Sequence, residues 1–293
     1  MDFDVISPKT SRELLEVIGK YQDKNFRFGA GYTDLINDLN SKPQEDLTVI
    51  NLAQLKDENF KTITINEKGA RIGALVTASR LTDNSILKTN YPVLWEATNS
   101  VASMQIRETA TIGGNICQAS PSGDISCALV SLKAICEIID SNGNVRNESL
   151  ADFFKGVKKT SLKKNEILRN IFIPPNSGKK IKSGYIKIGT RLSMEISIIS
   201  IAYHFQMDDG NKIINAGCSI GAVAPTIKFT EDACNYLIGK QFDSITEEDA
   251  DNFACLVKKY AKPISDIRAS AWYRSEVLFN STKAIFDKYE IKN

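Results

Sequence analysis

Hydrophobic residues in the first part of the chain recur at spacings that alternate between helix and strand. A capping-box pattern at Thr10 and Glu13 precedes an apolar stripe that continues to Ile18, so a helix is expected there. Residues 26–28 predict a short strand, and a second helical pattern follows at residues 35–39. The first segments of the chain therefore predict the order helix, strand, helix.

Further along, the same reasoning predicts a hairpin, a helix and two more strands. Residues 61–65 and 70–74 flank a turn-forming segment, which is typical of a hairpin. A helical pattern covers residues 91–101, and strands are expected at residues 134–140 and 166–173.

The pattern breaks down between residues 109 and 124, where small and turn-forming residues replace the apolar periodicity. We expect a long irregular loop there. Long loops in compact domains often have a functional role, so this segment is a candidate site.

The second half of the chain follows a linker-like segment rich in proline and glycine at residues 174–178. Beyond it the pattern predicts strands at residues 185–191, 196–207 and 212–223, then helices at residues 226–239, 247–260 and 271–289. Strands followed by helices indicate an α+β domain. A length of 293 residues also suits about two domains. The expected division is residues 1–175 and 179–290.

Composition excludes several classes of protein. Apolar residues make up 42% and charged residues 25%, which is typical of a globular chain. The net charge of +2 is spread evenly, so nucleic-acid binding has little support. The longest apolar stretch, residues 196–205, is too short to span a membrane. The acidic N-terminus does not resemble a secretory signal, so we expect a cytoplasmic protein.

Cysteine and histidine offer few metal ligands. None of the six cysteines forms a C-x-x-C pair, which argues against zinc and iron–sulfur sites and favours reduced, mostly buried thiols. The single histidine, His204, lies in a strand-like run, where a hydrogen-bonded packing role is more typical than catalysis.

Two glycine-containing segments are the candidates for chemistry. Residues 29–34, Gly-Ala-Gly-Tyr-Thr-Asp, connect a predicted strand to a helix, where main-chain N–H groups can meet an anion. The segment lacks the third glycine of a dinucleotide fingerprint, because Asp34 stands there. An ordinary strand-to-helix turn is the alternative.

In the second segment, Gly113 and Gly114 would let the main chain approach a ligand, while Thr111 and Asn115 offer polar groups. Asp124 adds a carboxylate nearby. Together the two segments predict a site for a phosphate-bearing cofactor. The alternative is a pair of unrelated turns, with Asp124 capping a helix.

These residues resemble a known family. The run from Gln105 to Ile116, followed by residues 119–124, resembles the second flavin loop of the FAD-binding medium subunits of molybdenum hydroxylases, such as bacterial xanthine dehydrogenase. Residues 31–35 resemble the first loop, and residues 224–226 and 266–274 resemble patterns of the C-terminal domain. Two positions depart from the family pattern: Tyr32 replaces a frequent glycine, and Glu108 a frequent asparagine.

The resemblance implies a fold and a set of FAD contacts. It implies a two-lobed PCMH-type FAD domain, as in vanillyl-alcohol oxidase, followed by a CO-dehydrogenase-flavoprotein-like domain with a three-stranded antiparallel sheet and three helices. The implied FAD contacts are Phe28, Gly29, Ala30, Gly31, Tyr32, Thr33, Asp34, Leu35, Val101, Thr111, Ile112, Gly113, Gly114, Asn115, Asp124, Leu168 and Lys187. No residue is expected to act as a catalytic acid or base, or to ligate a metal.

The resemblance also implies a function within a complex. A small subunit with [2Fe–2S] clusters and a large molybdopterin subunit would be the partners, and electrons would leave through FAD to NAD or another acceptor. Lys187 would stabilise the reduced cofactor. Xanthine is the expected substrate of the partner by family frequency. The alternatives are a self-contained FAD oxidoreductase of the same fold and a non-catalytic scaffold subunit.

Overall fold

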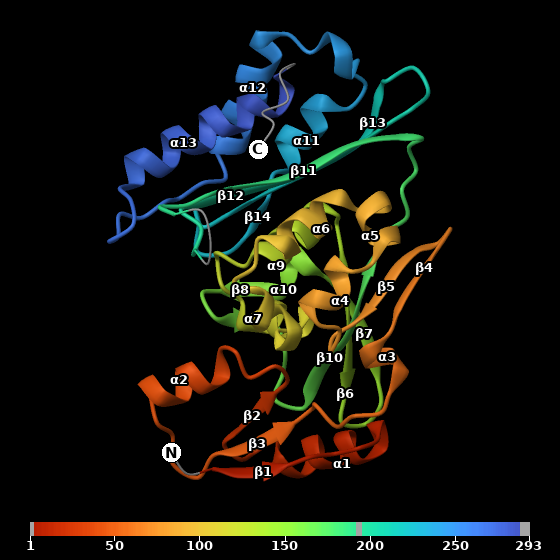
Figure 1. Cartoon of the computed structure of the whole chain (residues 1–293), viewed down its shortest axis with the longest axis vertical. Coiled ribbons are helices and arrows are strands. Elements are labelled where there is room, and N and C mark those ends of the chain that lie inside the picture. Colours follow the sequence, from red (N-terminus) through yellow and green to blue (C-terminus); the bar gives the residue numbers. More distant parts are fainter. Residues whose placement is uncertain (1–2, 192–194, 288–293) are drawn as a thin grey trace.

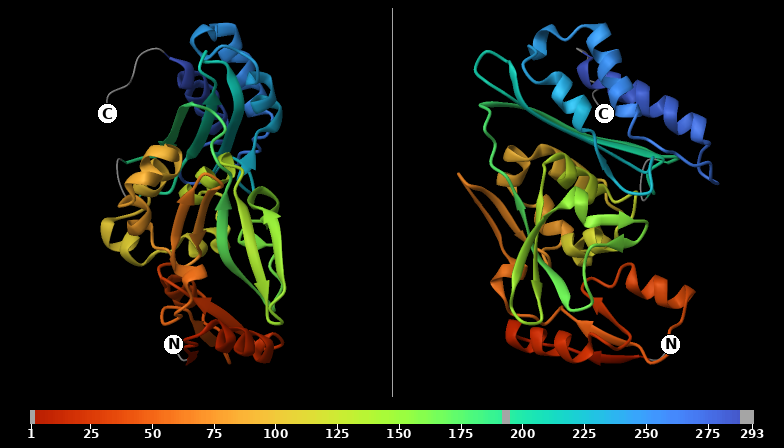
Figure 2. Two further views of the ribbon diagram at one scale, coloured as in Figure 1. Left: turned by 90° about the vertical axis from the view of Figure 1, so that its right-hand side faces the viewer. Right: turned by 180° about the vertical axis from the view of Figure 1, so that it is seen from behind.

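The computed structural model describes residues 3–191 and 195–287, and Figure 1 shows them arranged in three tiers. An N-terminal lobe lies at the bottom, a second lobe lies in the middle, and the C-terminal sheet with its helices lies at the top. Both views of Figure 2 show the same order. The three tiers stack in the same order as their residues occur in the sequence.

The N-terminal lobe contains a parallel sheet in the order β1 (Asp4–Ile6), β3 (Thr48–Asn51), β2 (Phe26–Gly29). Helix α1 (Ser11–Tyr21) is capped by Thr10, whose hydroxyl accepts from the Glu13 N–H; the Glu13 carboxylate accepts from the Lys9 N–H, so only half of the predicted capping box forms. Helix α2 (Leu35–Ser41) buries Leu35 and Leu39 against this sheet in a small core with Val49. The predicted strand and both helices are therefore confirmed.

The second lobe is built on an antiparallel sheet with five paired strands in the order β4, β5, β10, β6, β7 among the described residues. Their bounds are β4 (Ile63–Asn66), β5 (Gly69–Gly73), β6 (Ile135–Asp140), β7 (Val145–Ser149) and β10 (Glu166–Ile173). A two-stranded ribbon follows β7, formed by β8 (Phe154–Gly156) and β9 (Lys159–Thr160). The predicted hairpin at residues 61–74 is β4–β5, and the two later strands are β6 and β10.

Short helices complete this lobe, and the left view of Figure 2 shows those between residues 78 and 109 on one side of the sheet. They are α3 (Glu58–Lys61), α4 (Ala78–Thr82), α5 (Ser85–Asn90), α6 (Pro92–Asn99), α7 (Met104–Thr109), α8 (Ile112–Gln118), α9 (Asp124–Ser131) and α10 (Leu150–Phe153). Helix α6 matches the helix predicted at residues 91–101.

The prediction of a long irregular loop at residues 109–124 was wrong. Helix α8 occupies its centre, and the Thr111 hydroxyl accepts from the Gly114 N–H at 3.0 Å to cap it. A glycine pair argues against a helix interior on intrinsic propensity, but Gly113 and Gly114 lie in the first turn, where the cap and the packing of Ile112 and Ile116 outweigh that cost.

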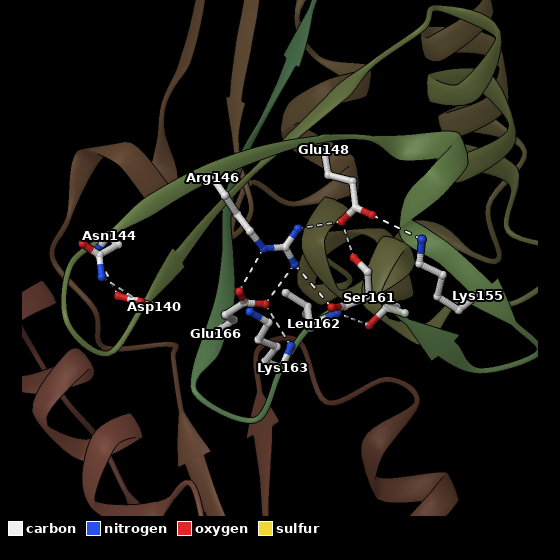
Figure 3. Close-up of polar contacts among 10 residues, drawn as sticks. Asp140, Asn144, Arg146, Glu148, Lys155, Ser161, Leu162, Lys163 and Glu166 are labelled. Atoms are coloured by element: carbon white, nitrogen blue, oxygen red, sulfur yellow. Dashed lines mark hydrogen bonds and ion pairs between the residues drawn. The ribbon is translucent and has the colours of Figure 1, made fainter.

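An ion-pair network connects the strands at the β7 edge of the sheet (Figure 3). Arg146 on β7 reaches across β6 to Glu166 on β10, with Nε–Oε1 and Nη2–Oε2 distances of 2.9 Å, and it also pairs with Glu148 at 2.7 Å. Hydrogen bonding to Arg146 lowers the pKa of Glu166, so the carboxylate stays ionised. The bidentate geometry is the arrangement in which an arginine pair contributes most to stability.

The C-terminal unit is an antiparallel sheet covered by helices. Its strands are β11 (Lys180–Ile188), β12 (Ile199–Met207), β13 (Ile213–Gly221) and β14 (Lys228–Phe229), paired in that order. Helices α11 (Glu231–Leu237), α12 (Glu247–Lys258) and α13 (Ala271–Lys283) follow, with 3₁₀ turns at Phe242–Ser244 and Ala284–Phe286. The predicted α+β class is therefore confirmed.

Three details of this unit differ from the prediction. β14 extends the expected three-stranded sheet, and it takes the place of the start of the helix predicted at residues 226–239. β11 covers residues 180–188 instead of 185–191, because it pairs along the whole length of β12. The last helix ends at Lys283, and residues 288 and 289 of the predicted helix lie outside the described part of the chain.

The two larger cores meet at α9 and β11. All eight residues of α9 are buried, because α9 lies between the second lobe and the sheet formed by β12 and β13. Alternate residues of β11 face opposite ways, as a strand requires. Tyr185 packs against the core of the second lobe, while Ile186 and Ile188 pack against the C-terminal core.

Candidate functional site

The first glycine segment connects β2 to α2 and approaches the end of α7, just before the second segment begins at Thr111. A Cβ added at Gly31 would lie 2.0 Å from the Thr109 carbonyl oxygen, so only glycine permits this approach. Tyr32 adopts a left-handed backbone conformation with φ of 61°, and its ring lies over Gly29. The first glycine segment therefore lies against the residues that lead directly into the second one.

The second segment is the start of α8, and its two glycines have different surroundings. Gly113 donates to the Ala74 carbonyl at 2.8 Å, and a Cβ there would lie 2.7 Å from the same oxygen. Gly113 is therefore required by packing. A Cβ at Gly114 would meet only Thr111 Oγ1 within 4 Å, at 2.9 Å, and Gly114 is exposed. Gly114 is the one that leaves the main chain open to a ligand.

Between these segments lies a cavity of about 520 Å³, bounded by the N-terminal lobe and the second lobe. In Figure 1 this region lies between α2 and β2 below and α7 above. The predicted residues that line it are Phe28, Ala30, Gly31, Tyr32, Thr33, Asp34, Leu35, Val101, Thr111, Gly113, Gly114, Asn115 and Leu168. Predicted residues from four separate parts of the sequence therefore form the wall of one cavity.

Four predicted residues do not line the cavity: Gly29, Ile112, Asp124 and Lys187. Gly29 is buried beneath the Tyr32 ring, and Ile112 is a fully buried core residue. The buried Asp124 forms an ion pair at 2.8 Å with the half-buried Lys187 instead.

This ion pair is the centre of a buried polar network. Asp124 accepts from the Tyr185 hydroxyl at 2.6 Å and from the Ser197 hydroxyl at 3.1 Å. Lys187 also donates to the Ser100 carbonyl at 3.0 Å, directly beside Val101 of the cavity wall. Burial and the Asp124 charge raise the pKa of Tyr185 well above its ordinary value, so the tyrosine remains a donor. The network therefore connects β11 to the wall.

Asn115 also has a structural contact. Its Oδ1 accepts from the Ser126 N–H at 3.1 Å and from the Ser126 hydroxyl at 2.8 Å, so it satisfies the first turn of α9. Asp124 is the first residue of α9, and Gly123 occupies the cap position, so the alternative of Asp124 as the helix cap was wrong.

The remaining lining residues were not predicted. They are Phe26, Arg27, Leu52, Phe60, Ala74, Leu75, Ala102, Ile106, Ala110, Cys117, Gln118, Ile125, Leu162 and Ile167. Ile106 and Ala110 lie within the motif that carried the resemblance, so the motif could have indicated them. Most of the others are apolar residues, and nothing in the sequence separates them from core residues.

Charged groups gather near α2. Burial raises the pKa of Asp34, and the charge of Asp38 raises it further. Asp38 pairs with Lys158 of the β8–β9 turn at 2.9 Å, and this contact lowers the pKa of Asp38. The Asp38–Lys158 pair joins the N-terminal lobe to the second lobe beside the cavity.

The two departures from the family pattern have structural explanations. Tyr32 is accommodated because its ring covers Gly29, where a side chain would collide with it. The Glu108 carboxylate accepts from the Ser79 hydroxyl of α4 at 2.7 Å, which ties α7 to that helix. Burial raises the pKa of Tyr32, so its phenol stays neutral in the cavity wall.

Other site types find no support in the described residues. Within residues 3–191 and 195–287, no group of three histidine, cysteine, aspartate or glutamate residues could hold a metal ion. In the same residues, no helix has the length and apolar character to cross a membrane. Cys127, Cys136, Cys218 and Cys234 are buried, whereas Cys117 and Cys255 are exposed.

The fold and the cavity define the class: a two-lobed cofactor-binding protein that encloses its ligand between lobes, with an additional sheet-and-helix unit. Residues 1–176 match the family described as the FAD binding domain in molybdopterin dehydrogenase. Residues 184–289 match the CO dehydrogenase flavoprotein C-terminal domain. The chain belongs to the FAD-binding subunits of the molybdenum hydroxylase family, as the resemblance implied.

Individual relatives agree with this assignment. The nicotinate dehydrogenase FAD-subunit of Eubacterium barkeri is 26% identical over 288 residues, which cover 97% of this chain and 95% of the relative. The xanthine dehydrogenase FAD-binding subunit of Escherichia coli O157:H7 is 33% identical over 229 residues, 76% of each chain. The structure of reconstituted CO dehydrogenase from Oligotropha carboxidovorans superposes with a TM-score of 0.87 at 24% identity, covering 97% of this chain and 96% of that chain, which confirms the fold.

The cavity fits FAD on physical grounds. Its volume of about 520 Å³ is within the usual range for ligand sites. Apolar walls from Phe60, Val101 and Leu168 suit a flat ring system, and the main chain at Gly31 and Gly114 suits phosphate oxygens.

Proposed function

We propose that this chain holds one FAD in the cavity between its two glycine segments and transfers electrons through it. The observation that carries the proposal is the contact of Gly31 with the Thr109 carbonyl, which brings both segments to one cavity. The proposed contacts are Phe28, Gly29, Ala30, Gly31, Tyr32, Thr33, Asp34, Leu35, Val101, Thr111, Ile112, Gly113, Gly114, Asn115, Asp124, Leu168 and Lys187. Gly29, Ile112, Asp124 and Lys187 would act from behind the wall.

FAD, when bound, supplies exchange of single electrons and of hydride. The chain's own residues position the cofactor and adjust its electrostatic surroundings. Lys187 holds its ammonium at the Ser100 carbonyl, where a positive charge favours the more negative, reduced cofactor. Asp124 fixes that ammonium and partly offsets its charge. No proton transfer by a side chain is required.

We further propose that the chain works with a small subunit carrying [2Fe–2S] clusters and a large molybdopterin subunit, in a cytoplasmic heterotrimer. Relatives named as FAD subunits or medium chains support this assignment. The terminal acceptor would be NAD or another oxidant, and xanthine-like CH groups would be oxidised on the large subunit. We also propose that residues 1–175 and 179–290 are the domains, since each contains one of the two larger cores.

Reconstitution tests the cofactor. The purified full chain is stripped of flavin, titrated with FAD and separated from free FAD by gel filtration. We expect one FAD per chain and a visible flavin spectrum that differs from that of free FAD. A chain that gains no flavin bands after FAD addition would leave the scaffold alternative standing.

Isolation from the native source tests the partners. We expect the chain to copurify with one subunit that shows a [2Fe–2S] electron paramagnetic resonance signal and with another that contains molybdenum. A chain that purifies alone and oxidises a small substrate without other subunits would refute the partner assignment and favour the self-contained oxidoreductase.

A further inference from the structure

Helix α7 (Met104–Thr109) forms part of the cavity wall through Ile106, yet none of its six residues is buried in the described structure. Met104 is 71% exposed. Apolar burial therefore does little to fix this helix. Its position depends on hydrogen bonds, and Arg107, which is half-buried, makes the ones that reach the preceding turn.

Arg107 Nη1 donates to two carbonyl oxygens at the end of α6, that of Asn99 at 3.1 Å and that of Val101 at 2.8 Å. Lys187 donates to the carbonyl between them, that of Ser100, at 3.0 Å. Three consecutive carbonyls are thus bound by two cations. The last carbonyls of a helix lack partners within it and carry partial negative charge, so cations are favoured there.

The residues held in this way belong to the cavity wall. Val101 and Ala102 both line the cavity, and Ala102 has a φ of 40° in the left-handed region. A residue with a Cβ keeps that conformation only when its surroundings impose it. The bonds from Arg107 and Lys187 to consecutive carbonyls of this turn supply that constraint.

The two cations are not equivalent. Lys187 is paired with Asp124 at 2.8 Å, and so its charge is partly offset. The bonds of Arg107 go to carbonyls, and no carboxylate pairs with its guanidinium within the described residues. Glu108, its neighbour, is turned toward Ser79. The constraint from Arg107 therefore does not depend on the Asp124 network.

We propose that Arg107 is a positioning residue of the FAD site: it fixes the Asn99–Ala102 turn, and through it the wall at Val101 against which the cofactor lies. This inference rests on the proposed function. The inference extends the proposed function, because it assigns a role to Arg107, which neither lines the cavity nor belongs to the proposed FAD contacts.

The test uses the purified full chain with Arg107→Met and Arg107→Lys. The methionine variant loses both charge-assisted hydrogen bonds of Arg107, and we expect it to raise the Kd for FAD at least about tenfold; we expect the lysine variant to raise the Kd about threefold. We also expect the visible circular dichroism band of the bound flavin to change in the same order, because that band reports how the ring is held.

Arg80→Met is the matched control. Arg80 also donates to a backbone carbonyl, that of Lys61, at 2.6 Å, but it does not line the cavity or contact the turn. This variant is expected to bind FAD with the wild-type Kd and band, even if its melting temperature falls. Melting temperatures of the flavin-free proteins separate an effect on the site from general destabilisation.

Three outcomes would contradict the proposal in different ways. If the methionine variant folds and matches wild type in both Kd and circular dichroism band, the positioning role is wrong. If the methionine variant does not fold, a lysine variant that matches wild type in both readouts contradicts the role instead. If the methionine variant folds and differs from wild type only in melting temperature, Arg107 is merely structural. If the wild-type chain itself binds no FAD, the proposed function fails first, and that result is distinct from the other two.

Discussion

Gly31→Ala provides a direct test of how the two lobes meet. The new Cβ would lie 2.0 Å from the Thr109 oxygen and 2.7 Å from its carbonyl carbon, whereas ordinary contacts begin at about 3.4 Å. Both obstacles are backbone atoms, so no side-chain rotation relieves the overlap. The two segments would have to separate by roughly 1.4 Å.

Forcing extra volume into a packed region costs about 1–3 kcal/mol, and a backbone obstacle places this substitution in the upper part of that range. Alanine would return a few tenths of a kcal/mol by restricting the unfolded chain. We therefore expect a net loss of about 2 kcal/mol in the free energy of unfolding. FAD binding should weaken by at least about tenfold, because separation of the segments widens the cavity between them.

Urea unfolding of the flavin-free protein and FAD titration by fluorescence measure the two effects. Gly114→Ala is the matched control, since its Cβ meets only Thr111 Oγ1 and alanine is favoured over glycine in a helix. That variant should keep its stability to within about 1 kcal/mol and lose FAD affinity because it narrows the cavity. A Gly31→Ala protein with wild-type stability and Kd would refute the convergence on which the site depends.

Three further predictions concern groups around the site. Lys187→Met should lower the midpoint potential of bound flavin and, by leaving the buried Asp124 without its cation, destabilise the protein by about 3–5 kcal/mol. Lys187→Arg should keep the wild-type potential and stability. An unchanged potential in the methionine variant would remove this lysine from the site. Burial lowers the pKa of His204 from 6.5 to about 4, so the folded state binds protons less readily and stability is complete above about pH 6.5 and declines toward pH 4. His204→Gln should therefore lose less stability than wild type between pH 7 and pH 5. The histidine accounts for a loss of up to about 3 kcal/mol when the pH falls all the way to 4. Equal losses for the two proteins in urea unfolding would contradict this prediction. Cys117 lines the cavity, and although the residue as a whole is exposed, burial of its thiol raises the pKa to about 12. Cys117 should therefore react slowly with dithiodipyridine and still more slowly with FAD present, while Cys255 reacts equally in both states. Equal labelling of Cys117 with and without FAD, measured by mass spectrometry, would place FAD elsewhere.

Much of the site was readable from the sequence because its chemistry is local. The strand, glycine and helix order around Gly31 depends on neighbouring residues only, and so does the capped glycine pair after Thr111. Most residues of both segments line the cavity. The segment at residues 109–124 was misjudged as a loop because the cap and the buried Ile112 and Ile116 decide its helical form, and propensity alone does not include that packing.

Other features depended on contacts between distant residues. Asp124 and Lys187, 63 positions apart, were both expected at the cofactor, and the structure pairs them with each other behind the wall. The apolar lining, such as Phe60 and Leu162, resembles any core position until the lobes are assembled.

The sequence by itself determined the order of strands and helices, the two glycine segments and the family, since each depends on residue types at short spacings. Only the tertiary structure decided that the Gly31 main chain lies against Thr109, that β14 extends the C-terminal sheet, and that Arg107 and Lys187 both donate to the carbonyls of one turn. Close approach, strand pairing and ion pairing join residues far apart in the chain, and their geometry is set by how the cores pack together.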